Sequence, residues 1–185
     1  MRYYGLFICM LMCCAPESAP PQAPMRIPVP VSGKQIKEVQ ASTTLSYKGQ
    51  DFGPQNAFDR ASETAWCEGS KGIKGDWIEV QFNAPTTLAL LSVEGGFYLN
   101  DKTLIKNGRV RKLRITTDTG WSKEAEVPYV PERMHSSKRF KVRSTTLPIP
   151  PQSQSIRFEI IDADKGHTTS DVCISEIRMY QPDDS

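Results

Sequence analysis

Short segments in which apolar and polar residues alternate recur along the chain from about residue 35 onward. The clearest lies at 76–82, where every second residue is apolar: Ile78, Val80 and Phe82. A period of two places successive side chains on opposite faces of a β-strand, so one face is buried and the other is solvated. Five further segments alternate or form short apolar runs, at 87–93, 110–116, 138–145, 156–161 and 174–180. Turn sequences separate them and no sustained helical stripe occurs, which predicts an all-β fold, an antiparallel sandwich or a barrel.

Basic residues alternate with apolar residues in two of these segments, 109–114 and 138–143. Charged residues on one face of a strand are typical of edge strands, where they are solvated and discourage pairing with other chains. The alternative is a face that binds an anionic ligand. The solvated edge is the simpler interpretation.

The overall charge excludes one class of partner. The 185 residues include 23 Lys and Arg against 21 Asp and Glu, a formal charge of +2. Nucleic-acid binding by a basic surface calls for a much larger excess, so we expect no nucleic-acid partner. Only two histidines occur, His135 and His167, far apart in the sequence, and this argues against a histidine-centred catalytic or metal site.

The first 14 residues have the features of an export signal. Arg2 precedes an apolar run over 5–12 that is too short to span a bilayer, and two cysteines follow it. Leu11 stands three positions before Cys14, and this arrangement resembles a bacterial lipobox. It predicts residues 1–14 as a lipoprotein signal peptide, lipidated at Cys14, with lipidation at Cys13 or ordinary secretion as alternatives. The protein would then be extracytoplasmic, at the outer membrane or cell surface, and would contact the membrane only through its anchor.

Proline-rich sequence follows over 15–35 and is expected to form an extended tether. Two further cysteines, Cys67 and Cys173, lie in the body of the chain. In an exported protein they are candidates for one disulfide. Two unpaired buried thiols are the alternative.

Motifs over 36–181 resemble those of discoidin-like domains, the coagulation factor V/VIII type C family. The pattern is an Asn-Ala-x-Asp turn, a Thr-x-Trp about five residues on, and then a long strand. The fuller set of fragments is similar to the branch called NADase-type glycan-binding domains. In order, they are Asn56–Asp59, Thr64–Gly69, Gly75–Phe82, Gly95–Tyr98, Asn107–Val110 and Asp171–Ile177. The resemblance implies an antiparallel β-sandwich of the galactose-binding-like jelly-roll type.

The resemblance also implies a structural calcium ion where the Asp turn meets the last strand. Side-chain oxygens would come from Asp59, Thr64 and Glu176, and carbonyl oxygens from Asn56 and Ala61. Ca²⁺ prefers such oxygen ligands. One residue departs from the family pattern: Arg60 stands where glycine is usual. A left-handed turn is disfavoured for such a residue. The alternative is that Asp59 caps its own turn without metal.

Five loop residues are candidate ligand contacts, because an aromatic ring beside amide and guanidinium donors suits carbohydrate recognition. They are Phe97, Tyr98, Asn100, Asn107 and Arg109. The alternative is that Asn107-Gly108 forms an ordinary hairpin turn. Two tryptophans, Trp66 and Trp77, are more simply core residues than sugar platforms.

These observations predict a non-catalytic carbohydrate-binding module on a monomeric envelope lipoprotein, with a glycan or cell-surface polysaccharide as its partner. The first alternative is a protein-binding adhesin or envelope interaction protein that uses the same loop face. A hydrolase is a weaker alternative. It would depend on Asp162, Asp164 and Asp171, which are more simply solvated loop acids.

Overall fold

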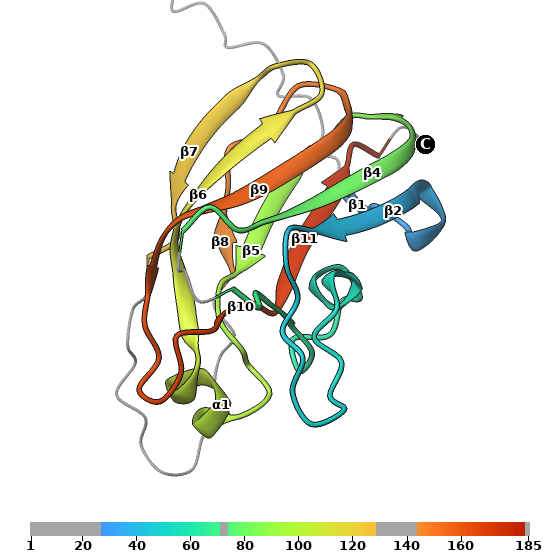
Figure 1. Ribbon diagram of the computed structural model, residues 1–185. Helices are drawn as coiled ribbons and strands as arrows, with labels where there is room; N and C mark the ends of the chain where they lie inside the picture. Colours follow the sequence, from blue (N-terminus) through green and yellow to red (C-terminus); the bar gives the residue numbers. More distant parts are fainter. Residues whose placement is uncertain (1–26, 71–73, 129–143, 184–185) are drawn as a thin grey trace, which may run out of the picture.

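The computed structural model describes residues 27–70, 74–128 and 144–183 (Figure 1). The predicted signal peptide, the lipidation site, most of the tether and the basic segment 138–143 lie outside these ranges. Among the described residues, no helix combines the length and the hydrophobicity that a membrane crossing requires.

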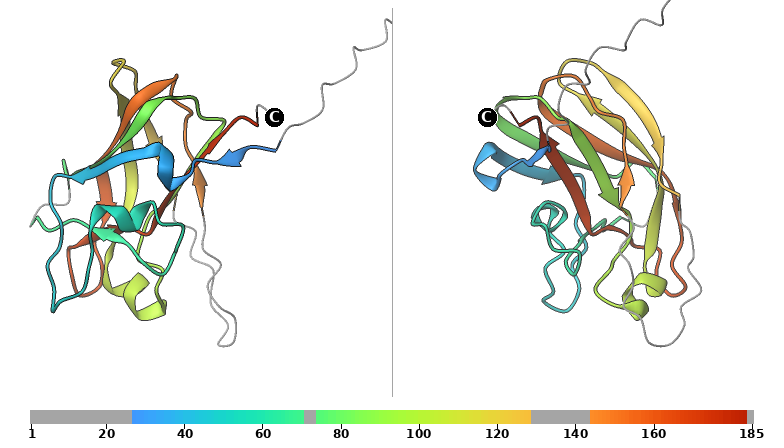
Figure 2. Two further views of the ribbon diagram at one scale, coloured as in Figure 1. Left: turned by 90° about the vertical axis from the view of Figure 1, so that its right-hand side faces the viewer. Right: turned by 180° about the vertical axis from the view of Figure 1, so that it is seen from behind.

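Two β-sheets pack face to face (Figures 1 and 2). The smaller sheet has the order β1 (Val29–Pro30), β11 (Glu176–Gln181), β5 (Leu90–Glu94) and β8 (Thr145–Thr146). The larger has the order β2 (Ile36–Ala41), β4 (Trp77–Thr86), β9 (Ser153–Asp164), β6 (Gly108–Thr117), β10 (Val172–Ile174) and β3 (Trp66–Cys67), with β7 (Ser122–Glu126) paired to β6. The predicted all-β sandwich is confirmed. One pair, β6 with β10, is parallel, and the other described strand pairs are antiparallel.

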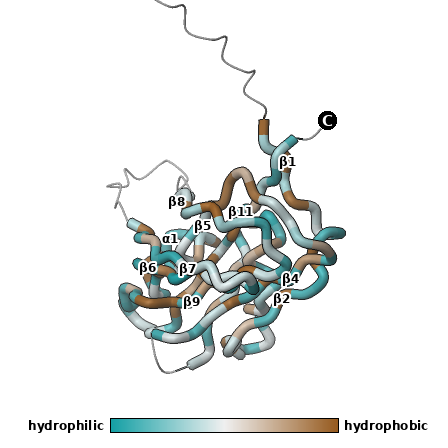
Figure 3. The backbone as a smooth tube through the Cα atoms, turned by 90° about the horizontal axis from the view of Figure 1, so that it is seen from above, coloured by the Kyte–Doolittle hydropathy of each residue, from teal (hydrophilic) through white to brown (hydrophobic). Residues whose placement is uncertain are grey.

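The core between the sheets follows from the period-two pattern. In β4 the alternating residues Ile78, Val80 and Phe82 are fully buried. They pack with inward residues of β6 and β9, such as Leu113 and Phe158, in one hydrophobic cluster. Hydrophobic and hydrophilic stretches are interleaved along the backbone (Figure 3), as burial of one face of each strand requires.

The first strand begins before the predicted domain boundary at residue 36. Val29 and Pro30 pair with Gln181 and Tyr180 at the edge of the smaller sheet. Proline is tolerated at a sheet edge because its missing N–H is not needed there. The short 3-10 helix η1 (Gly33–Gln35) then leads into β2. The two ends of the described domain therefore lie side by side.

A second, smaller cluster lies beneath the loops at one end of the sandwich. It contains Phe52, Ala65, Phe97 and the two body cysteines. Cys67 and Cys173 form a disulfide that joins β3 to β10 across 106 residues of sequence. The predicted pairing is confirmed. Phe52 and Phe97 meet edge to face with ring centroids 5.8 Å apart, so the loops that carry them share this support.

Three segments gather over this cluster: 42–53, 95–109 and 164–171. We call them the loop end. The second contains the helix α1 (Asp101–Lys106). Backbone bonds hold the third against it, since His167 N–H donates to the Ile105 carbonyl and Gly108 N–H donates to the Asp171 carbonyl. Figure 1 shows α1 at the end of the sandwich opposite the β6–β7 turn.

The basic face of β6 is neutralised by acids on neighbouring strands. Lys112 and Arg114 both pair with Glu124 of β7, at 2.8 and 3.0 Å, and Arg114 also pairs with Glu159 of β9 at 3.1 Å. The outer face of 109–114 is solvated, as predicted, but the predicted edge strand is wrong, because β6 lies inside the larger sheet between β9 and β10 and also pairs with β7. Trp66 is a core residue, as expected, whereas Trp77 lies on the partly exposed outer face beneath Arg157, whose guanidinium carbon is 3.9 Å from the ring centroid.

Candidate functional site

Four of the predicted calcium ligands lie together in the 3-10 helix η2 (Pro54–Ala57) and the loop that follows it. Oxygen atoms of three of them surround the hydroxyl of the fourth, Thr64. Thr64 Oγ1 lies 2.7 Å from Asp59 Oδ2, 2.8 Å from the Ala61 carbonyl oxygen and 3.5 Å from the Asn56 carbonyl oxygen. A hydroxyl has one hydrogen to donate, so it cannot satisfy all three acceptors at once. Such a convergence of oxygens is the arrangement that a cation stabilises.

The fifth predicted ligand, Glu176, faces this loop from the last strand. Its side chain is 1% exposed, and within the described residues its Oε2 atom has no hydrogen-bond partner. The backbone N–H of Arg60 donates to this carboxylate. Burial is the main reason that the pKa of Glu176 is raised to about 8; the carboxylates of Asp59 and Glu94 act in the same direction, and the charge of Arg178 acts against them. The Asp59 turn and Glu176 therefore meet, as the motif predicts.

A third carboxylate, Glu94, lies directly opposite Glu176 in the register of β5 and β11. It is 3% exposed. Arg178 donates to it from Nε at 3.0 Å and from Nη2 at 2.8 Å, and Ser62 Oγ donates at 2.7 Å. Glu94 and Glu176 thus share the charge of Arg178, and the carboxylate of Asp59 also acts on Glu176, which leaves excess negative charge around Glu176 if all three acids ionise. The sequence motifs do not identify Glu94, Ser62 or Arg178, because their roles arise only from strand pairing.

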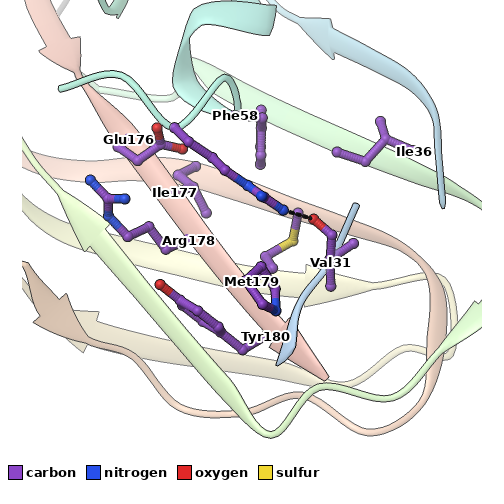
Figure 4. Close-up of a pocket in the computed structure, with 10 residues that line it drawn as sticks. Val31, Ile36, Phe58, Glu176, Ile177, Arg178, Met179 and Tyr180 are labelled. Carbon is purple, nitrogen blue, oxygen red and sulfur yellow. Dashed lines mark hydrogen bonds between the residues drawn. The ribbon is translucent and has the colours of Figure 1, made fainter. Parts of the chain in front are cut away.

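Arg60 adopts the left-handed conformation, with φ of 68°. The turn therefore forms despite the missing glycine. The Arg60 side chain lines a small pocket over the paired strands β1 and β11, where Nη2 donates to the Val31 carbonyl at 2.7 Å. Figure 4 shows this hydrogen bond as a dashed line, with Glu176 and Arg178 on the strand behind it. Arg60 thus ties the Asp59 turn to the first strand.

Two substitutions of Arg60 separate the effect of its hydrogen bond to Val31 from the effect of its left-handed backbone. R60A should lower the free energy of unfolding by about 1–2 kcal/mol, because it loses a charged donor to Val31 and keeps a left-handed residue. R60G loses the same bond but relieves the backbone, and should be about 1 kcal/mol more stable than R60A. Urea unfolding of the three proteins measures this order. Equal stability of R60A and R60G would contradict it.

The donor set suits a hard divalent cation. Within 27–70, 74–128 and 144–183, no three His, Cys, Asp or Glu side chains converge closely enough to hold a metal. A cation here would therefore use the carboxylates of Asp59 and Glu176 together with neutral oxygens. That mixture of carboxylate, hydroxyl and carbonyl oxygen is preferred by Ca²⁺ and is poor for softer metals.

The structure gives three of the five predicted ligand residues an internal role. Phe97 is buried in the cluster beneath the loop end. Asn100 caps α1 by accepting from the Thr103 N–H, and Asn107 donates to the Thr103 carbonyl at the other end of the helix. Asn107-Gly108 is therefore the junction of α1 with β6 and not a hairpin turn. These contacts explain the residues without a ligand.

The other two, Tyr98 and Arg109, lie side by side on the loop end. A Cβ atom built on Gly96 would lie 3.2 Å from Arg109 Cγ and 3.4 Å from Tyr98 Cε2, so both side chains pack across this glycine. Both are partly exposed. The Tyr98 N–H donates to Ser175 Oγ, next to Glu176, which links this pair to the strand that faces the Asp59 turn.

The sequence motifs do not include one exposed aromatic residue, Tyr47. Tyr47 lies at the tip of a turn in 42–53 and is 44% exposed. The signal that could have identified it is the sequence Tyr-Lys-Gly-Gln, in which a basic residue and a glycine follow an aromatic residue in a polar segment.

Comparisons with known proteins agree with this architecture. An α-(1→3)-arabinofuranosyltransferase of Mycolicibacterium smegmatis is 26% identical over 148 residues, which are 78% of this chain and 9% of that protein. The chain therefore spans a small part of the curated relative that it matches. Among solved structures, a family 32 carbohydrate-binding module from a family 31 glycoside hydrolase of Clostridium perfringens has a TM-score of 0.56 at 13% identity, over 82% of this chain and 94% of that chain. A second family 32 module from the same species, solved with galactose, has a TM-score of 0.50 at 17% identity, over 78% and 93%.

The family assignment rests on the sequence of the domain itself. Residues 31–180, most of the chain, match the family described as the NAD glycohydrolase translocation F5/8 type C domain. This span contains the described strands of both sheets except β1 and the last residue of β11. The chain therefore belongs to the NAD glycohydrolase translocation F5/8 type C domain family, a branch of the discoidin-like β-sandwiches.

Proposed function

We propose that this domain is a non-catalytic carbohydrate-binding module that recognises a glycan through its loop end. The observation that carries the proposal is the pairing of Tyr98 with Arg109 across Gly96, on loops fixed by the disulfide cluster. A partly exposed ring can stack on a sugar, and a guanidinium beside it can donate to hydroxyl or carboxylate oxygens. The fold shared with the galactose-bound module supports the proposal.

Two of the three acids named for a hydrolase, Asp162 and Asp164, are paired in the structure. Asp162 lies 3.4 Å from Lys74, and Asp164 lies 3.3 Å from Arg111. Both acids lie on the partly exposed surface of β9, where an ion pair with a basic neighbour accounts for them. This arrangement favours binding over hydrolysis.

A structural calcium ion belongs to the same proposal. Asp59, Thr64 and Glu176 would hold it with side-chain oxygens, and Asn56 and Ala61 with carbonyl oxygens. The ion would balance the excess negative charge around Glu176 and fix the loop next to Ser175, on which Tyr98 rests. It would act through structure, and no bond-making step is assigned to it.

The proposed setting is a lipid-anchored envelope protein. It rests on the lipobox-like sequence at Cys14 and the proline-rich sequence after it. Such a tether would hold the sandwich away from the membrane. Metabolic labelling with a palmitate analogue, which should be lost in C14A, tests this assignment.

A glycan array tests the binding function. The mature chain should bind a defined subset of glycans, and Y98A/R109A should reduce this binding by about tenfold or more. Q40A, an exposed residue of β2, is the matched surface control. Retention on no glycan and on no envelope polysaccharide would contradict the function. Capture of one protein partner, unaffected by deglycosylation, would favour the adhesin alternative.

A further inference from the structure

Two lysines from different segments meet at one exposed aromatic ring on the loop end. The Nζ atoms of Lys48 and Lys106 lie 5.2 and 5.4 Å from the ring centroid of Tyr47. Lys48 is the next residue in the turn, and Lys106 is the last residue of α1. We call these three residues the Tyr47 cluster.

The turn that presents Tyr47 is fixed by its backbone. The Gln50 N–H donates to the Tyr47 carbonyl at 2.9 Å. The two residues between them, Lys48 and Gly49, have φ of 48° and 73°. Two consecutive left-handed residues define a tight two-residue turn, which glycine at the second position favours. The ring is therefore held at the tip and is 44% exposed.

The two lysines of the Tyr47 cluster differ from the basic residues of β6 in their ionic contacts. On the face of β6 each lysine or arginine of 111–114 is paired with a carboxylate of β7 or β9. Within the described part of the chain, neither Lys48 nor Lys106 takes part in such an ion pair. Their distances from the ring lie near the outer limit of cation–π contact, so the ring holds them only weakly. Two positive charges around one ring favour the approach of an anion.

The segment that carries Lys106 also exposes two apolar side chains. Ile105, the residue before Lys106 in α1, is 46% exposed, and Leu99 in the same segment is 48% exposed. An exposed ring, two ammonium groups with no ion pair among the described residues, and exposed apolar side chains on the same loop end match the two sides of an acidic sugar, which has an apolar C–H face and an anionic group. A neutral sugar would leave the ammonium groups without a partner.

We propose that the Tyr47 cluster selects acidic glycans, whose carboxylate or phosphate group binds Lys48 and Lys106 while the sugar ring stacks on Tyr47. The proposal rests on the carbohydrate-binding function above and names its ligand class. It predicts that affinity falls with added salt, because the charges are solvent-exposed.

Calorimetric titration of the mature chain tests the proposal with three soluble probes. They are an oligogalacturonate, its carboxyl-reduced neutral counterpart, and a glycerol-phosphate oligomer. The wild-type protein should bind at least one acidic probe about tenfold or more tightly than the neutral one. K48Q/K106Q should remove this preference, whereas K48R/K106R should retain it. The control K37Q/K123Q removes two exposed lysines of β2 and β7 and should change affinity less than about twofold.

The outcomes separate the two proposals. If neutral glycans bind the wild-type protein and the acidic probes bind no better, the selectivity for acids is wrong and the binding function stands. If array and titration both show no glycan binding, both are wrong. Binding to vesicles that contain anionic phospholipid, abolished by K48Q/K106Q and without any glycan affinity, would identify the cluster as a membrane contact and overturn the proposal. The acidic probe that binds more tightly, the oligogalacturonate or the glycerol-phosphate oligomer, shows whether the cluster recognises a carboxylate or a phosphate group.

Discussion

Replacing both Cys67 and Cys173 with alanine should lower the free energy of unfolding by about 4–5 kcal/mol. The disulfide spans 106 residues, so in the chain-entropy description its loss frees a large part of the unfolded chain. Both cysteines are fully buried among Phe52, Ala65 and Phe97. Removal of their sulfur atoms therefore also weakens the packing beneath the loop end.

Urea unfolding of the wild-type protein and C67A/C173A under identical conditions measures this difference. The wild-type protein in reductant is the control, since it retains the side-chain volume and loses only the bond. It should be destabilised nearly as much as the alanine variant. A loss below about 1 kcal/mol in both would show that the cross-link contributes little to stability. Glycan binding should weaken in parallel, because the disulfide cluster supports the loop end.

Calcium should raise the stability of the domain by about 3 kcal/mol when its concentration is a hundredfold above the dissociation constant. The physical reason is the charge around Glu176, on which the carboxylates of Asp59 and Glu94 act against the single charge of Arg178. Thermal unfolding with chelator, with Ca²⁺ and with Mg²⁺ measures the gain. Mg²⁺ should have little effect, because a turn of carbonyl and hydroxyl oxygens does not supply compact octahedral geometry.

The pH dependence in chelator follows from the raised pKa of Glu176. Below about pH 4.5 this group is protonated in both the folded and the unfolded chain. Between 4.5 and about 8 the unfolded chain ionises while the folded chain keeps its proton, so the free energy of unfolding falls as the pH rises. Ca²⁺ displaces that proton and should abolish most of the fall.

The variant E176Q is the matched test of both effects. Glutamine keeps the shape of the side chain and removes its charge, so E176Q in chelator at pH 8 should be at least as stable as the wild-type protein. Added Ca²⁺ should then stabilise the wild-type protein and leave E176Q nearly unchanged. An equal response of both proteins to Ca²⁺ would place the ion elsewhere.

Much of the fold could be predicted because burial of one strand face leaves a period-two pattern in the sequence. The alternation in 76–82 and 110–116 predicts β4 and β6 within a few residues of their observed bounds. The meeting of Asp59 with Glu176 could be predicted from motif resemblance, since a turn followed by a first long strand is characteristic of the family. The disulfide followed from two cysteines in a chain expected to be exported.

Other features could not be predicted, because they depend on contacts between distant segments. The helix α1 has six residues, too few for a helical stripe to be recognised. The parallel pairing of β6 with β10 arises from how the chain crosses the sheet. The Glu94–Arg178 pair and the approach of Lys106 to Tyr47 join residues 84 and 59 positions apart, and nothing local in the sequence marks them.

Titration of the isotopically labelled domain with a glycan from the array, followed by NMR, tests the central claim most directly. If the domain holds glycans on its loop end, the backbone resonances that shift should come from 42–53, 95–109 and 164–171. Those of η1 and of the β6–β7 turn should stay in place. Shifts concentrated on the outer face of β4 and β9, or none at saturating glycan, would contradict the account.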